Sequence, residues 1–136
     1  MNRLNGFRPY MLDILRILAA YMFMLHGTAK IWEFPLSMTQ GKGAVEFLSL
    51  YWVGGVIEII GGSLLILGLF VRAAAFILSG QMAYAYFFIF ISADNVLFPL
   101  KNGGELAALY SLLFLYFVFA GAGKFSLDYK LFKHRR

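Results

Sequence analysis

The fold is decided by residues 10–32, which read YMLDILRILAAYMFMLHGTAKIW. This run is mostly apolar and is close to the ~20 residues that an α-helix needs to cross a bilayer. A secretory signal would also follow basic residues such as Arg3 and Arg8. The apolar region of a signal, however, extends to only ~15 residues and ends at a small-residue cleavage site. We therefore predict that residues 10–32 form a retained first membrane span.

Three further apolar runs of similar length follow, at residues 50–70, 73–92 and 106–121. The whole chain is 61% hydrophobic and 14% charged, against ~45–50% and ~25% in soluble domains. These features leave no room for a separate soluble domain. The sequence predicts a single all-α domain over residues 1–136, an integral membrane four-helix bundle with up-down-up-down topology.

The distribution of Lys and Arg predicts which way this bundle faces. With four spans, both termini and the tight turn at residues 68–72 lie on the same side of the membrane. The opposite loops contain only Lys42 and Lys101, apart from Lys30 at the end of the first span. The positive-inside rule therefore predicts cytoplasmic termini and a basic cytoplasmic tail at 122–136. The basic residues on the cytoplasmic side are Arg3, Arg8, Arg72, Lys124, Lys130, Lys133, Arg135 and Arg136.

Composition excludes several classes of function. The chain contains no cysteine, which excludes disulfides, thiol redox chemistry and thiolate metal ligands. It also lacks a Gly-rich nucleotide fingerprint and the His and carboxylate spacing of a metal site. A net charge of +5 is what a basic tail beside a membrane produces. We therefore expect no nucleic-acid binding, no metal and no intrinsic cofactor.

Four ionisable residues interrupt the first span, where a charge costs at least ~2.5 kcal/mol and normally faces a partner or a cavity. At ~100° per residue, they lie within an arc of ~140° on one side of the helix. Asp13 and Arg16 are expected to form a polar cluster near the cytoplasmic interface, as an i,i+3 pair that snorkels towards water. The other two are His26 and Lys30 in the outer half of the span.

The second span carries one charge, Glu58, among glycines that allow close helix packing. Gly54, Glu58 and Gly62 share one face of that helix at i,i+4 spacing. Counted from the outer end of the span at ~1.5 Å per residue, Glu58 lies about 12 Å deep, level with His26 on the antiparallel first span. We predict that Glu58 pairs with Lys30 or His26 inside the bundle.

These residues define a candidate ligand-binding site in the outer half of the bundle. Gln81 and the tyrosines at 84, 86 and 110 either complete its polar lining or serve ordinary packing. Glu105 follows Asn102 by three residues, the spacing of a helix-starting capping box, so a structural role is favoured for it. The candidate ligand-binding residues are His26, Lys30, Glu58, Gln81 and Glu105.

The order and spacing of several short motifs resemble the DoxX family, and the resemblance covers nearly the whole chain. It implies a small four-helix protein of the bacterial inner membrane, often described as a membrane oxidoreductase component linked to thiosulfate, quinone or oxidative-stress systems. The motifs are Leu25-His26-Gly27-Thr28-Ala29-Lys30 with Phe34-Pro35, Glu58-x-x-Gly61-Gly62 with Leu67-Gly68, Asn102-Gly103-Gly104-Glu105, and Gly121-x-Gly123-x-x-Ser126-Leu127-Asp128.

The chain departs from the family pattern at two places. Many members carry a histidine late in the third span, where residues 87–91 are all apolar here. The closing Gly-Pro-Gly of the family is here Gly121-Ala122-Gly123. With only His26 in a span, one protomer does not supply a bis-histidine haem site, although a homodimer would.

Three functions fit these residues. The first is a redox-associated membrane protein that binds a quinone-like lipophile, with His26 and Lys30 donating to its carbonyl oxygens and Glu58 handling a proton. The second is a binder or carrier of a small lipid or solute, and the third is a scaffold that anchors soluble redox enzymes. The expected partners are membrane lipid, a small lipophilic ligand, and a second copy of the chain or a soluble redox protein. Quinone is the candidate cofactor.

Overall fold

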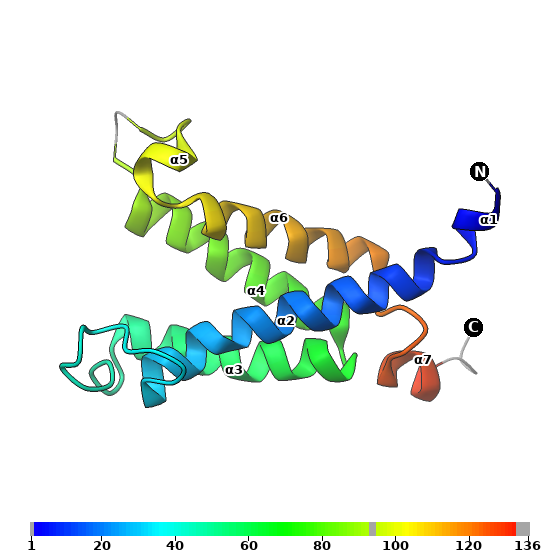
Figure 1. Cartoon of the computed structure of the whole chain (residues 1–136), viewed down its shortest axis with the longest axis horizontal. Helices are drawn as coiled ribbons and strands as arrows, with labels where there is room; N and C mark the ends of the chain where they lie inside the picture. Colours follow the sequence, from blue (N-terminus) through cyan, green and yellow to red (C-terminus); the bar gives the residue numbers. More distant parts are fainter. Residues whose placement is uncertain (1, 93–94, 133–136) are drawn as a thin grey trace.

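The computed structural model describes residues 2–92 and 95–132, and all the secondary structure within them is helical (Figure 1). The all-α class is therefore confirmed. The end of the expected basic tail, from Lys133 to Arg136, lies outside the described residues. The long helices are α2 (Arg8–Trp32), α3 (Leu50–Leu67), α4 (Val71–Ala85), which continues into the π-helical η1 (Tyr86–Phe90), and α6 (Glu105–Ala120). The short helices are α1 (Asn2–Asn5), α5 (Pro99–Asn102) and α7 (Leu127–Phe132).

The long helices begin and end within a few residues of the four apolar runs in the sequence. Three of them are long and apolar enough to cross a bilayer: α2, α3, and α4 together with η1, which cover Val71–Phe90. The fourth, α6, is equally apolar but has only 16 residues. The membrane-helix character of the chain is thus confirmed for three helices, and a fourth span stays a prediction.

The helices associate as two pairs, α2 with α3 and α4 with α6, and contacts between α3 and α4 join the pairs (Figure 1). Glycines bring α2 and α3 close together. A Cβ atom on Gly27 would lie 2.6 Å from the carbonyl oxygen of Gly55, and one on Gly62 would lie 2.9 Å from Cβ of Met24. A Cβ atom on Gly54 would lie 3.2 Å from Gln81 Nε2 of α4 and 4.0 Å from Lys30 Nζ of α2. The glycines of the second span therefore serve two neighbouring helices.

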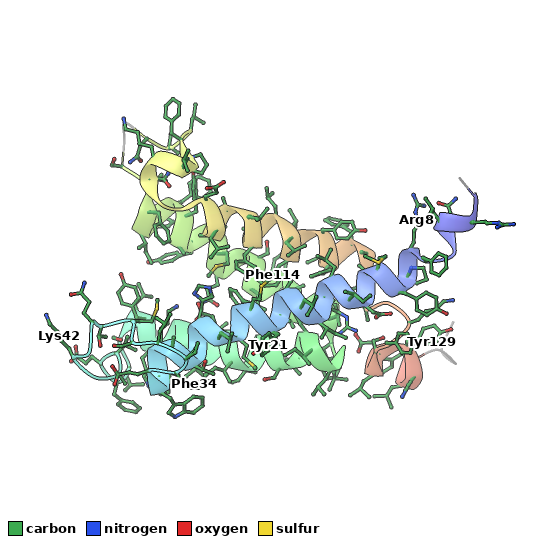
Figure 2. All side chains as sticks on the ribbon, viewed as in Figure 1. Arg8, Tyr21, Phe34, Lys42, Phe114 and Tyr129 are labelled. Atoms are coloured by element: carbon green, nitrogen blue, oxygen red, sulfur yellow. The ribbon has the colours of Figure 1, made fainter. Side chains whose placement is uncertain are left out.

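The packed core lies between α2 and the pair of α4 and α6. Phe23 of α2 meets the rings of Tyr110 and Phe114 of α6, at centroid distances of 5.1 and 4.8 Å, and Phe114 lies between the helices in Figure 2. Large apolar side chains also cover the outside of the bundle. Phe76 and Phe119, for example, are 67% and 74% exposed. An apolar exterior over an apolar core is the arrangement that a surrounding lipid phase requires.

Two turns set the path of the chain, and one differs from expectation. The turn after α3 is as tight as predicted: Gly68 ends the helix at φ +70°, and α4 begins at Val71. The expected capping box at the start of α6 is wrong. Asn102 ends α5 and accepts a hydrogen bond from the Gly104 N–H at 2.7 Å. Gly103, at φ +76°, turns the chain between the two helices, so Asn102 does not cap α6.

Candidate functional site

A cavity of about 350 Å³ opens among the four long helices at the end where α3 and α6 begin. Most of its wall is apolar and aromatic. The polar side chains that reach it come from α2, α3, α4 and α6, and they are His26, Lys30, Tyr51, Glu58, Gln81, Tyr84 and Tyr110. Apolar walls with a few converging polar groups are typical of small-molecule sites.

A buried ion pair lies at the polar side of this cavity. Lys30 Nζ is 2.7 Å from Glu58 Oε1. Glu58 is only 1% exposed, and the Lys30 side chain is 15% exposed. The close approach of α2 and α3 at Gly27 and Gly55 places the two side chains within reach. The predicted pairing of Glu58 is therefore confirmed, with Lys30 rather than His26 as the partner.

Gln81 extends the ion pair to α4. Its Nε2 donates to Glu58 Oε1 and to the Gly54 carbonyl oxygen, both at 3.2 Å. Two acceptor oxygens are left over. Within residues 2–92 and 95–132, neither Glu58 Oε2 nor Gln81 Oε1 has a hydrogen-bond partner, although both atoms are buried. Glu58 and Gln81 both line the cavity, so its wall contains two side chains that each have an acceptor oxygen without a donor.

His26 occupies a different part of the wall, next to α6. Its ring packs edge-on against Tyr110 at a centroid distance of 6.3 Å and contacts Phe23 at 6.5 Å. Tyr84 also lines the cavity. Tyr86 does not, because its hydroxyl donates to the Val96 carbonyl oxygen at 2.7 Å and holds the connection to α5. Of the tyrosines that were candidates for a polar lining, 84 and 110 reach the site.

Glu105 lies apart from the other candidate ligand-binding residues. It is exposed in the first turn of α6 and is not part of the cavity wall. Leu106 and Tyr110 of the same helix do line the cavity. The helix thus turns its residue 105 outward. A carboxylate in the first turn of a helix interacts favourably with the helix dipole, which accounts for Glu105 in structural terms.

Asp13 and Arg16 form a second polar cluster at the other end of the bundle, but not the exposed one that was expected. They are 2% and 0% exposed, with Arg16 Nη2 3.1 Å from Asp13 Oδ1. Arg16 also donates to the carbonyl oxygens of Leu65, Ile66 and Phe125. The snorkelling interpretation is wrong because the chain after α6 folds back over the pair.

The returning segment is held by backbone hydrogen bonds that the sequence pattern did not reveal. Asp13 Oδ2 accepts from the N–H groups of Lys124 and Phe125 at 3.0 and 2.9 Å. Gly123, at φ +80°, lies so close to the Asp13 carboxylate that no Cβ would fit. The Gly121-x-Gly123 motif was the available signal, since two glycines so close together indicate a chain that approaches another group closely.

Asp128 has a related structural role nearby. Its carboxylate accepts from the N–H groups of Phe70 and Val71 at 2.8 and 2.9 Å, at the start of α4. A cavity of about 590 Å³ adjoins it, lined in part by Arg72 and Gly121. Because both carboxylate oxygens of Asp128 accept from the backbone, Asp128 attaches α7 to the turn between α3 and α4.

A metal centre is not supported by the described part of the chain. No group of three or more His, Cys, Asp or Glu side chains in it is arranged to hold a metal ion. The candidate site is therefore the ion-paired cavity between the helices.

Comparison with known proteins identifies the family of the chain. The family model described as DoxX matches residues 11–91, more than half of the chain. A protein of Haemophilus influenzae described as uncharacterized is 65% identical over 134 residues, covering 98% of this chain and 99% of the relative. No solved structure matches. The matched region includes His26, Lys30 and Glu58, and the chain is a member of the DoxX family.

Proposed function

We propose that this chain is a multi-pass protein of the bacterial inner membrane that binds a quinone-like or other small lipophilic ligand as part of a redox system. The observation that carries the proposal is the cavity of about 350 Å³ with a buried ion pair in its apolar wall. Its volume falls within the ~300–1,000 Å³ of small-molecule sites. An ion pair is also a costly way to join two helices that already pack through glycine, and a ligand site is a reason to keep it.

The residues around the cavity suit a ligand with polar oxygens on an apolar ring. Lys30 and His26 offer N–H groups to such oxygens, and Glu58 is placed to accept or return a proton. The apolar walls hold the ring away from water. The sequence contains no cysteine, so we propose that electrons pass between the bound ligand and the redox centre of a partner protein.

We expect His26→Gln to weaken the binding of decylubiquinone about tenfold, because one hydrogen bond to the ligand is lost or misplaced. Binding is measured with the full chain in lipid nanodiscs, against nanodiscs without protein, and native mass spectrometry identifies any ligand that co-purifies. Ser63→Ala is the control, since Ser63 bonds to the Ile59 carbonyl oxygen of its own helix and does not line the cavity. Equal binding by both variants, or no binding by the parent protein, contradicts the proposal. A co-purifying phospholipid would favour a lipid carrier instead.

The membrane topology belongs to the same proposal: four spans in up-down-up-down order, with both termini in the cytoplasm. Arg8 and Tyr129 lie at one end of the bundle and Lys42 at the other (Figure 2), and the first end carries most of the Lys and Arg residues. At ~1.5 Å per residue, α6 is ~24 Å long against a hydrocarbon core of ~30 Å. A helix this short can cross the membrane if the bilayer becomes thinner around it.

Alkaline phosphatase fusions test this topology, because the enzyme is active only outside the cytoplasm. A fusion after residue 132 is expected to be inactive, and a fusion at Lys42 is expected to be active. A green fluorescent protein fusion at each point is the complementary control, since it should fluoresce only at the cytoplasmic one. An active phosphatase at the C-terminus would contradict both the orientation and the fourth span.

A further inference from the structure

The polar wall of the cavity has more buried hydrogen-bond acceptors than donors to satisfy them. This excess indicates a ligand that donates hydrogen bonds. Glu58 Oε2 and Gln81 Oε1 are both buried, and no donor from residues 2–92 and 95–132 reaches either of them. Glu58 is 1% exposed and lines the cavity. A buried acceptor without a donor is costly, and the cost is larger for a charged group.

Both N–H groups of Gln81 are engaged on this side of the cavity, and Lys30 uses one of the three N–H groups of its ammonium on Glu58. Gln81 Nε2 donates to Glu58 Oε1 and to the Gly54 carbonyl oxygen, and Lys30 Nζ donates to Glu58 Oε1 at 2.7 Å. Lys30 Nζ gives the Glu58 carboxylate a counter-charge at 2.7 Å, which favours the ionised form, and in that form the second oxygen accepts hydrogen bonds and does not donate them. The ion pair therefore maintains the unpartnered acceptor.

We propose that the cavity binds a ring that carries a hydroxyl group, such as a hydroquinone or phenol, in preference to the corresponding carbonyl compound. The inference rests on the proposed function and names its ligand class. A phenolic hydroxyl donates to Glu58 Oε2 or Gln81 Oε1 and still accepts from a remaining Lys30 N–H. A quinone carbonyl accepts from Lys30 but leaves both oxygens unpartnered and places its own lone pairs against them. Tyr110 and Phe23 supply aromatic surface for the ring.

The test compares three ligands with the same trimethylated ring: trimethylhydroquinone, trimethylquinone and the dimethyl ether of the hydroquinone. Each is bound to the full chain in nanodiscs by equilibrium dialysis without oxygen, against protein-free nanodiscs. The parent protein is expected to bind the hydroquinone about tenfold to a hundredfold more tightly than either of the others, the range of a hydrogen bond to a charged acceptor. The ether lacks the hydroxyl protons but is larger by two methyl groups, whereas the quinone lacks them without added bulk, so weak binding of both shows that the hydroxyl donor is what matters.

Two variants locate the acceptors. Glu58→Gln replaces the charged acceptor with an amide and should bring the preference for the hydroquinone to within about threefold. Gln81→Met removes the other acceptor while leaving the ion pair intact, so it keeps the test usable if the first variant folds poorly, and it should lower the preference severalfold. Ser63→Ala should leave the preference unchanged.

The outcomes separate this inference from the proposed function. If the quinone binds as tightly as the hydroquinone, or more tightly, the preference for a hydroxyl donor is wrong while ligand binding stands. If the hydroquinone is preferred but neither variant alters the preference, the assigned acceptors are wrong. If none of the three ligands binds, the inference and the quinone-like ligand of the proposed function fail together.

Discussion

Replacing Glu58 with Ala is expected to lower the free energy of unfolding by about 3–5 kcal/mol, because it leaves the Lys30 ammonium in the bundle without its counter-charge. The loss includes the hydrogen bond from Gln81 Nε2 to Glu58 Oε1. Glu58→Gln should cost less, because its amide oxygen still accepts from Lys30. The measurement is an SDS titration in mixed micelles, followed by the loss of helical circular dichroism.

Glu46→Ala is the matched control for this prediction. Glu46 is an exposed carboxylate in the loop between α2 and α3, and exposed substitutions usually change stability by no more than about 0.5 kcal/mol. The same charge is removed in both variants, so the difference between them reports burial and pairing. An unfolding curve for Glu58→Ala that overlays the curve for Glu46→Ala would mean that the pair with Lys30 contributes nothing to the fold.

The Glu58 pair was predictable from the sequence because only helix geometry was needed. The apolar runs give each helix a start and an end, and a rise of ~1.5 Å per residue then gives each side chain a depth. This depth places Glu58 level with His26 on the adjacent antiparallel helix, one helical turn from Lys30, so either side chain was a candidate partner. The choice of Lys30 over His26 depended on side-chain direction, which depth does not define, and His26 turns towards Tyr110 instead.

The Asp13 and Arg16 cluster was not predictable in the same way. Its main partners, Lys124 and Phe125, are more than 100 residues away in the chain. Their approach depends on the backbone after α6, where Gly121 and Gly123 take φ values of +80°. The periodicity of polar residues along one helix does not predict that a distant segment folds back over that helix. The capping box expected at Asn102 and Glu105 failed for a similar reason, since the turn at Gly103 is a property of the connection and not of the helix that follows.

Replacing Arg16 with Met is expected to lower the free energy of unfolding by about 3–5 kcal/mol, the range for breaking a buried ion pair. Met fills much of the volume but makes no hydrogen bond to the carbonyl oxygens of Leu65, Ile66 and Phe125, which Arg16 now satisfies. Asp13 would also lose its counter-charge. The Arg16 side chain therefore links α2, the end of α3 and the segment that follows α6. The same SDS titration measures the change.

Arg8→Met provides the matched control, because Arg8 lies on the same helix and is exposed. It should change stability by no more than about 0.5 kcal/mol. Hydrogen exchange distinguishes the role of Arg16 in the returning segment from a general loss of stability. If Arg16 and Asp13 together hold that segment, the N–H groups of Lys124 and Phe125 should exchange faster in Arg16→Met by a larger factor than those of α4. Uniform acceleration along the chain would show that Arg16 stabilises the helices themselves, and unchanged exchange with unchanged stability would show that the buried pair is energetically neutral.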